Sequence, residues 1–432
     1  MHHPVLPQLC GERAACVGSF PMSRKVGETP VDRFFSGREP DESVVVPIFD
    51  KWFIIIKSLK IKPKQELLMK PTRVIASFVC LIFFFAFTPA AYGRMRIHHI
   101  NVGQADATLL EFENAAILID AGGSNINGTR DRDHLWNYLN DFFSARPSLR
   151  RTLYSLIVTH PHIDHTKYLM EILRGFPGHP GFRVRNFVDN GDIRDSSGTP
   201  QLVSARAFIA QQSGPQKPIY NKVDAADIGP NGYTTVWLAE LAKAPSSVDI
   251  RFLNASRTCS NENNDSLVVL ITHGQSKVLI SGDAEAENSK ESACLRAIPR
   301  MLQKFGQGSL LDVDVYKAGH HGSHNGTSDK FIEALSPKIT VISAGFYTDR
   351  AVPAQRGFDA FSYAHPRDEA VARMIEHTTG SRPKKDVYVM HAEGKKRIVV
   401  PLKNLTAAVY CTCWDGDIVI EADTNGNVKV IP

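Results

Sequence analysis

Cysteine is scarce in this sequence. Only 7 of the 432 residues are cysteine, and those beyond residue 93 are Cys259, Cys294, Cys411 and Cys413. None of these four has zinc-finger spacing, which argues against a structural zinc finger. We expect a disulfide between Cys259 and Cys294. Cys411 and Cys413 are two residues apart on a predicted strand and are poorly placed to bridge each other.

An excess of charge of one sign is also nearly absent once the first 93 residues are set apart. The formal net charge is +5, but residues 1–93 hold 12 Lys/Arg against 8 Asp/Glu, and the remainder holds 38 against 37. Because the remainder is nearly neutral, any binding of anions must be local. This balance counts against a nuclease that grips long DNA, since phosphate contacts dominate such binding.

The most apolar run of the sequence is too short for an ordinary membrane span. Val74–Phe87 is almost entirely apolar, follows Lys70 and Arg73, and precedes small residues at Ala91 and Gly93. A spanning helix needs about 20 apolar residues, whereas the hydrophobic region of a signal peptide is shorter and ends at small residues. The pattern therefore predicts a secretory signal, with an uncleaved membrane anchor as the alternative.

These features divide the chain into three parts. We predict a signal peptide at 69–93, cleaved before Arg94, and therefore a secreted or periplasmic bacterial protein with no stable membrane span after processing. Residues 1–68 show no clear periodicity and are predicted to be a non-native or disordered extension, with Met69 as the true start. Residues 94–432 contain no compositional linker and are predicted to form one domain.

Strand-length hydrophobic runs alternate with helical patterns from residue 96 onward. The two halves, each a hairpin-rich sheet with helices outside, predict an α+β fold: an αββα sandwich of two mixed sheets flanked by helices. Residues 190–235 are rich in Gly, Ser, Pro and Gln and predict a long loop or lid. A β-meander is expected at 386–421, and a helix at 285–295.

Three histidines and a carboxylate lie within six residues, directly after an apolar strand. His160, His162, Asp164 and His165 suit a divalent ion such as Zn²⁺ or Mn²⁺. A loop this short cannot easily direct four ligands at one ion. We therefore expect His160 and His162 to hold one ion and Asp164 and His165 to hold a second. Pro161 disfavours a helix up to this point, which leaves the motif on a strand-end loop.

Two later segments also place polar residues at the end of a buried strand. Asp283 follows the apolar strand 278–281 and could bridge two cations. His320 and His321 stand between glycines, where the backbone can approach a ligand closely. Each segment is ambiguous alone, but the three motifs in this order predict a centre of two divalent ions, with Zn²⁺ first and Mn²⁺ as the alternative.

The order of these motifs resembles that of the metallo-β-lactamase fold superfamily. His160–His165 resembles its H-x-H-x-D-H signature, and the apolar run ending at Asp120 resembles the motif whose aspartate orients the metal loop. Asp283 matches the bridging aspartate, and His320 or His321 matches the last histidine ligand. The resemblance implies the αββα fold and a hydrolase.

Within that superfamily the sequence is most similar to the ComEC-type domain of bacterial DNA-uptake proteins. The similarity rests on V-G-Q-A-D-A at 102–107, N-D-S-L-V at 264–268, G-H-H-G-S at 319–323 and A-H-P at 364–366. It extends from about residue 96 to residue 422. We expect the DNA-uptake role not to transfer, because the membrane channel of that family is absent from this sequence.

One ligand that many superfamily members have is missing at its usual place. The strand there ends in Asp189 and Asn190 instead of a histidine, and His179 and His273 are interpreted as ordinary histidines. The ion at His160 and His162 is therefore expected to use Asp189, Asn190 or water, or to bind weakly.

The resemblance implies hydrolysis by a metal-bound hydroxide, which two cations make available at neutral pH. A phosphodiester, in a small molecule or a nucleic acid, is the expected substrate. Asp164, Asp283 and His365 are the predicted catalytic residues, and Lys317, Ser323 and His365 the predicted contacts to the substrate. The alternatives are a metallohydrolase of lactone, thioester or phosphorylated envelope substrates, and a relic of the fold that binds metal or ligand without turnover.

Overall fold

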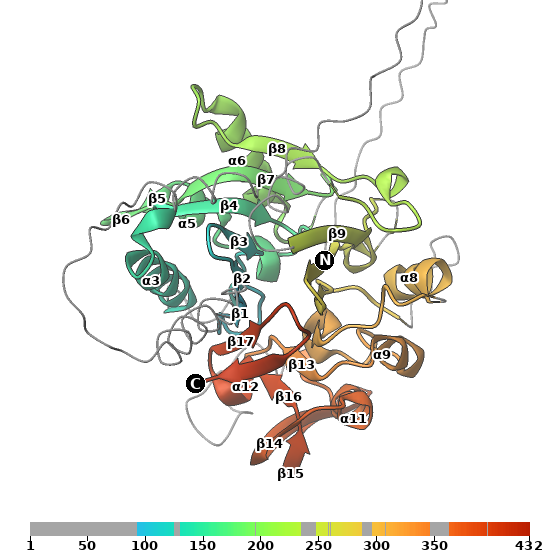
Figure 1. The fold of residues 1–432 in the computed structure, drawn as a ribbon. Coiled ribbons are helices and arrows are strands. Elements are labelled where there is room, and N and C mark those ends of the chain that lie inside the picture. The colour runs from blue at the N-terminus through green and yellow to red at the C-terminus, as the bar shows by residue number, and fades with distance from the viewer. Residues whose placement is uncertain are drawn as a thin grey trace, which may run out of the picture. The chain divides into compact units, whose positions relative to one another are not determined.

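The computed structural model describes residues 93–124, 130–194, 196–234, 248–257, 259, 261–286, 296–306, 308–345, 363–394 and 396–432. Within this part of the chain, two large sheets lie face to face with helices on their outer sides (Figure 1). The αββα sandwich predicted from the sequence is therefore confirmed.

The first sheet has eight strands and brings the two ends of the described chain together. Its order is β18 (Val428–Ile431), β17 (Ile418–Ala422), β1 (Met95–His99), β2 (Thr108–Glu111), β3 (Ala116–Ile119), β4 (Thr152–Ile157), β7 (Arg183–Asp189) and β8 (Ile219–Lys222). The strands from β3 to β8 run parallel, whereas β1 pairs antiparallel with both β2 and β17.

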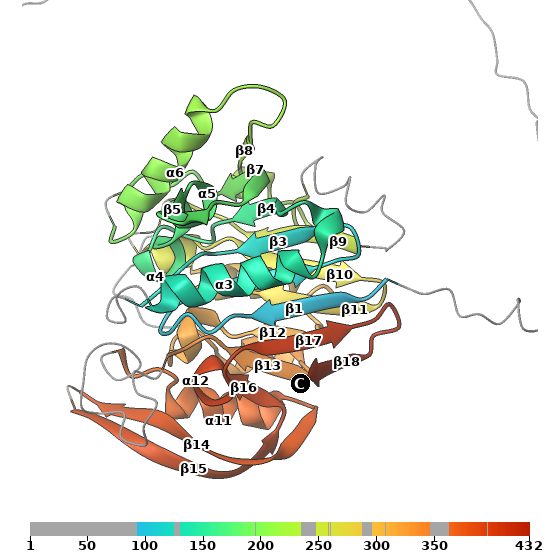
Figure 2. The same cartoon turned by 90° about the vertical axis from the view of Figure 1, so that its left-hand side faces the viewer.

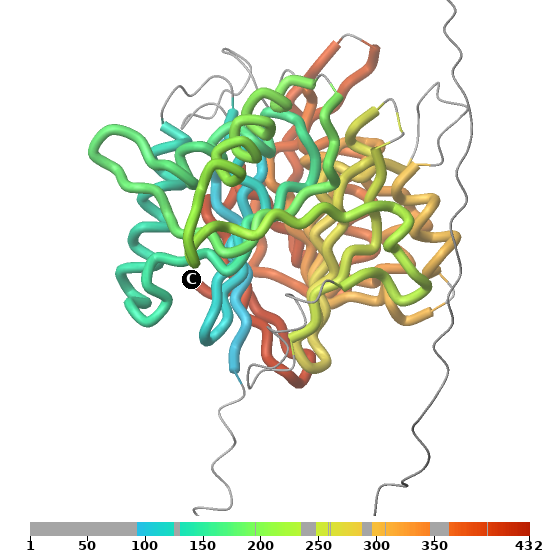
Figure 3. Tube along the Cα trace, turned by 90° about the horizontal axis from the view of Figure 1, so that it is seen from above, coloured from blue at the N-terminus to red at the C-terminus, as the bar shows by residue number. Residues whose placement is uncertain are grey.

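The second sheet has six strands. Its order is β16 (Val409–Cys411), β13 (Ile339–Ile342), β12 (Val315–Lys317), β11 (Ser276–Ile280), β10 (Val268–His273) and β9 (Val248–Asn254). Strands β11, β12, β13 and β16 run parallel. Seen from above, the first half of the chain in blue and green lies beside the second half in yellow and orange (Figure 3).

Apolar residues on successive strand positions fill two separate layers. Leu110 and Ile117 face the second sheet, whereas their neighbours Leu109 and Leu118 face the helices, and all four are fully buried. Side chains alternate along a strand, so a continuous apolar run is what a strand covered on both faces requires. This explains why these strands read as unbroken hydrophobic runs in the sequence.

The helices cover the sheets with one apolar face each. In α3 (Arg130–Ser144) the buried positions Leu135, Leu139 and Phe142 recur at helical spacing. Helix α3 lies across the first sheet in Figure 2, together with α5 (Leu169–Leu173) and α6 (Thr199–Gln211). Helices α8 (Ala297–Phe305), α9 (Asp329–Leu335) and α11 (Asp368–His377) lie on the other side (Figure 1).

Two predictions about chain organisation were wrong. The expected loop at 190–235 contains α6, which buries Leu202, Ala205 and Ile209, and the edge strand β8. The expected C-terminal meander is divided among three sheets. Strands β14 (Ser381–Glu393) and β15 (Lys396–Ala407) form a two-stranded sheet of their own, whereas β16 joins β13 and β17 joins β1.

The disulfide prediction also needs correction. Cys411 and Cys413 do bridge each other, with their Cα atoms 5.1 Å apart. The chain leaves β16 at Cys411 and enters the short helix α12 (Thr412–Asp415), and this turn brings the two cysteines within bridging distance. Cys259 is also disulfide-bonded. Cys294, its expected partner, lies outside the described residues, as does most of the expected helix at 285–295.

Among the described helices, none is both long and apolar enough to cross a membrane. The apolar run Val74–Phe87 and the rest of the predicted signal peptide lie outside the described residues, apart from Gly93.

Candidate metal centre

The predicted ligands follow the carboxyl ends of strands in both sheets. The histidine loop follows β4, Asp120 follows β3, Asp283 follows β11, and β12 leads into η4 (Gly319–Gly322), which contains His320 and His321. Strand β3 runs parallel to β4, and β11 runs parallel to β12. The carboxyl ends of parallel strands share one edge within each sheet, and the contacts of Asp283 with His160 and His165 show that these edges of the two sheets meet.

A tight group forms around Asp283. His165 Nε2 lies 3.2 Å from Asp283 Oδ1, and His321 Nε2 lies 3.5 Å from Asp283 Oδ2 and 3.3 Å from Asp164 Oδ2. His165 Nε2, His321 Nε2 and Asp283 Oδ1 are buried and make no hydrogen bond within the described residues. Buried polar atoms are normally satisfied, and nitrogen and carboxylate oxygen are the donors that zinc prefers. A divalent ion among these atoms fits that requirement.

A second group shares the same carboxylate. His160 Nε2 lies 3.1 Å from His162 Nδ1 and 3.8 Å from Asp283 Oδ2. His160, His162 and Asp283 could hold a second ion. Asp283 therefore belongs to both groups, and its role as a bridging residue stays a prediction.

Asp189 and Asn190 do not supply the missing third ligand of this second group. Asp189 accepts from Arg206 Nε at 2.8 Å and from the Tyr220 hydroxyl at 2.9 Å. Asn190 Nδ2 donates to backbone oxygens, among them that of Asp265 at 3.0 Å. Both side chains thus make hydrogen bonds within the protein that hold the end of β7 in place.

Glu262 is an acidic neighbour that sequence reasoning missed. Its Oε2 lies 3.6 Å from His162 Nε2, on the side of the ring opposite His160. The His162 side chain lowers the pKa of Glu262 more than the partial burial of Glu262 raises it. It occurs in an Asn-rich loop without a recognisable spacing. Its closeness to the N-D-S-L-V strand is the one signal that could have found it.

Asp120 fixes the orientation of His165. Its carboxylate accepts from the backbone N–H and the hydroxyl of Thr159, each at 2.7 Å, and from His165 Nδ1 at 2.7 Å. With the Nδ1 proton engaged, His165 presents the lone pair of Nε2 towards Asp283. The adjacent Gly122 allows the loop to pack here, because a Cβ at this position would overlap the backbone carbonyl of Asp164.

The geometry distinguishes the two adjacent histidines. His321 Nδ1 bonds to the backbone oxygen of Ser343 at 2.8 Å, which directs Nε2 into the group around Asp283. His320 Nδ1 instead lies 3.2 Å from Glu285, a buried carboxylate, and its Nε2 stays 3.9 Å from Asp283. His321 is therefore the member of the pair that joins His165.

The pKa values of His165 and Asp283 shift in opposite directions because opposite charges are concentrated in this group. Burial alone would lower the pKa of His165, but the carboxylates of Asp283 and Asp120 raise it well above its ordinary value. Burial would raise the pKa of Asp283, but the neighbouring histidines, His321 first, lower it well below its ordinary value. The site thus favours positive charge beside Asp283, which a dication would supply in place of protons.

A cavity of about 260 Å³ opens beside the two groups. Its lining includes His162, Asp164, Asp283, His320, His321 and His365. His365 Nδ1 lies 2.9 Å from Gln104 Nε2. Burial, then His320 and His321, lower the pKa of His365 well below its ordinary value. The predicted substrate contact His365 therefore reaches the cavity as a neutral imidazole.

The other two predicted substrate contacts do not line this cavity. The Lys317 side chain is 1% exposed and forms an ion pair with Asp106, which lies in the same group of possible metal ligands as His165, Asp283 and His321. Ser323 is buried, and its backbone N–H donates to the oxygen of His320. The expectation that they contact a substrate anion is therefore corrected. A buried ammonium needs a buried partner, which Asp106 provides.

Comparisons with known proteins show which families this chain resembles. Residues 100–181 match the metallo-beta-lactamase superfamily. The chain is 25% identical over 283 residues to ComE operon protein 3 of Bacillus subtilis, covering 63% of this chain and 31% of that protein. It is 24% identical over 251 residues to Recombination protein 2 of Haemophilus influenzae, covering 58% of this chain and 24% of that protein.

This chain thus matches less than a third of the length of either relative. Among solved structures, the metallo-beta-lactamase fold protein YhfI of Bacillus subtilis aligns with 76% of this chain and 100% of its own, at 10% identity and a TM-score of 0.37. Residues 100–181 therefore resemble a metallo-β-lactamase domain, and the chain has homologues among the ComEC-type competence proteins.

Proposed function

We propose that this domain hydrolyses phosphodiester bonds with two divalent ions, one held by His160, His162 and Asp283 and the other by Asp164, His165, Asp283 and His321. The observation that carries the proposal is the shared carboxylate of Asp283, which lies within 4 Å of histidine nitrogens from both groups. Two ions bound here would supply Lewis acidity to a water and to a phosphoryl oxygen. The nitrogen-rich donor set favours Zn²⁺ over Mg²⁺.

His365 has the geometry of a hydrogen-bond donor to the substrate. Gln104 Oε1 accepts from the backbone N–H of Gly345 at 3.4 Å, so its Nε2 is the atom that donates to His365 Nδ1. A neutral imidazole that accepts at Nδ1 carries its proton on Nε2. We therefore assign His365 as a hydrogen-bond donor, through Nε2–H, to the phosphoryl or leaving-group oxygen on which negative charge develops, and the proton stays on the imidazole. Loss of such a donor typically costs about 10²–10³-fold in kcat.

The test compares variants of the full chain, reconstituted with Zn²⁺ or Mn²⁺, on bis-p-nitrophenyl phosphate. Asp283→Ala should abolish turnover, and His365→Ala should lower kcat by about 10²–10³-fold with metal content unchanged. Lys330→Ala, at an exposed position of α9, is the control. Cleavage that responds to Asp283→Ala no more than to Lys330→Ala would contradict the proposal. Single-stranded DNA, a lactone and a β-lactam, assayed in parallel, define the substrate class.

We also propose that the protein is exported, on the strength of the apolar run Val74–Phe87 and the small residues after it. Sequencing the N-terminus of the exported protein should give Arg94 or a residue close to it. An N-terminus at Met1, or an intact apolar segment, would overturn this.

A further inference from the structure

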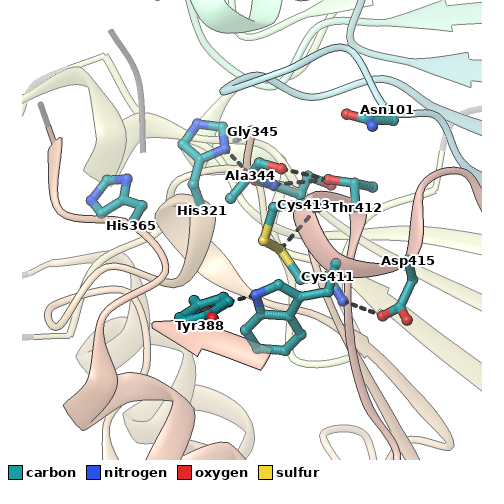
Figure 4. The surroundings of a disulfide bond; sticks show 12 residues. Asn101, His321, Ala344, Gly345, His365, Tyr388, Cys411, Thr412, Cys413 and Asp415 are labelled. Atoms are coloured by element: carbon teal, nitrogen blue, oxygen red, sulfur yellow. Dashed lines mark hydrogen bonds between the residues drawn. A yellow bond between two sulfur atoms is a disulfide. The ribbon is translucent and has the colours of Figure 1, made fainter. Parts of the chain in front are cut away.

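The hydroxyl of Thr412, which lies between the two bonded cysteines, makes two hydrogen bonds to the backbone of Ala344 near the proposed metal centre (Figure 4). Thr412 Oγ1 donates to the oxygen of Ala344 at 2.8 Å and accepts from the N–H of Ala344 at 3.0 Å. Both residues are at most 2% exposed. The register of β13 with β16 ends at Ile342 and Cys411, and there the chain turns into α12. The hydroxyl thus replaces the strand-to-strand bonds that this turn removes.

The two neighbours of Ala344 each hold a residue of the proposed active site. On one side, the oxygen of Ser343 accepts from His321 Nδ1 at 2.8 Å. On the other side, the N–H of Gly345 donates to Gln104, whose amide bonds to His365 Nδ1. One three-residue segment therefore orients both a proposed metal ligand and the hydrogen-bond donor His365. Figure 4 shows Ala344 of this segment between His321 and Thr412.

The disulfide restrains this threonine from both sides. Cys411 and Cys413 close a small ring that contains Thr412, and the N–H of Cys413 donates to Cys411 Sγ at 3.2 Å. The N–H of Cys411 donates in turn to Asp415 Oδ2 at 3.1 Å. With its backbone fixed by the ring, Thr412 loses little freedom when its hydroxyl engages Ala344.

We propose that Thr412, held by the Cys411–Cys413 disulfide, is a positioning residue for the metal ligand His321 and for His365. The inference rests on the proposed function in taking His321 as a ligand. Without the hydroxyl, the N–H and the oxygen of Ala344 lie unpaired in the interior, and the segment must move to satisfy them. The acceptor of His321 Nδ1 then moves as well. Loss of such an outer-shell contact typically costs about 10–100-fold in metal affinity.

The experiment measures the affinity of the full chain for Zn²⁺ by competition with a chromophoric chelator. Thr412→Val removes the hydroxyl at nearly constant volume, whereas Thr412→Ser retains it. The matched control is Thr340→Val on the same β13 strand, because the Thr340 hydroxyl bonds to Thr378 Oγ1 at 2.8 Å and does not contact the Ser343–Gly345 segment. Cys413→Ser opens the ring specifically, which a reductant would not do because Cys259 is also in a disulfide.

Thr412→Val should weaken one of the two zinc sites by about 10–100-fold, while Thr412→Ser and Thr340→Val bind as the wild type does. Cys413→Ser should weaken the same site to a smaller extent. Equal zinc affinity in Thr412→Val and wild type would overturn the proposal, as would equal losses in Thr412→Ser and Thr412→Val. If Thr412→Val does not fold, unchanged affinity in Cys413→Ser overturns it. A wild type that binds no zinc would instead refute the proposed function.

Discussion

Replacing Asp120 with asparagine should release metal without unfolding the protein. Asp120 has φ 61°, a left-handed conformation that asparagine tolerates better than most residues. Its Oδ1 accepts from the N–H of Thr159, so an asparagine must keep its oxygen at that position. The amide NH₂ then takes the place of Oδ2, which accepts from His165 Nδ1 and from the Thr159 hydroxyl.

An NH₂ facing His165 Nδ1 favours the tautomer that carries its proton on Nε2. That proton occupies the lone pair that faces Asp283, so the ring no longer serves as a ligand in this state. We expect about a 10–100-fold loss in affinity for one of the two ions, or roughly 1.4–2.7 kcal/mol. Competition with a chromophoric chelator measures this loss, and the melting temperature of the metal-free protein reports on folding. Wild-type affinity in Asp120→Asn would refute the assignment of His165 as a ligand held by Asp120.

Two further predictions concern buried charged pairs. Lys317→Met leaves the buried Asp106 carboxylate without its lysine partner and should lower the free energy of unfolding by about 3–5 kcal/mol. The double variant Lys317→Met/Asp106→Leu should regain much of this loss. Urea denaturation measures both variants, and equal stability of Lys317→Met and wild type would contradict a buried ion pair. Burial raises the pKa of Asp415, but hydrogen bonds from Arg382 and Lys385 lower it further, so the net shift is downward. The ionised carboxylate therefore contributes fully to folding stability above the ordinary aspartate pKa of about 3.9, and this contribution is lost as the pH falls through the lowered pKa. Asp415→Asn should therefore be less stable than wild type at neutral pH by about 2 kcal/mol, and this difference should shrink in acid. A stability difference that does not change with pH would exclude the ion pairs of Asp415 with Arg382 and Lys385 as its source.

The histidine loop and Asp283 could be predicted because each follows a strongly apolar strand. Strand periodicity places such residues at a sheet edge, and the metal-ligating side chains then identify the edge. The choice between His320 and His321 could not be made this way. Both adopt left-handed backbone angles in one tight turn, with φ 47° and 53°, so the direction of each ring depends on Ser343 and Glu285. Those contacts are distant in sequence.

Helix α6 was missed because its pattern is concealed. Its buried residues recur at helical spacing, but apolar residues also occupy its outer face, where Val203 is 46% exposed. Without a polar face, the hydrophobic periodicity is weak. Glycine, proline and serine around the helix further suggest a loop. Tertiary packing against α5, rather than local composition, decides the structure there.

The residues that orient the site were also beyond sequence reasoning. Gln104, Glu262, Glu285 and Thr412 are polar side chains in loops or at the starts of short helices, and no spacing links them to the residues they contact. The same applies to the Cys411–Cys413 disulfide. A separation of two suggests a strand that holds the cysteines apart, and only the turn into α12 brings them together.

The central claim is that one carboxylate is shared by two ions. Anomalous X-ray scattering from crystals of the zinc-loaded protein, measured above and below the zinc absorption edge, tests it most directly. We predict two zinc peaks, one among His160, His162 and Asp283 and the other among His165, His321 and Asp283. The first should be the weaker, because a third histidine is missing there. Two peaks of which neither contacts Asp283, or none at these histidines, would contradict the account.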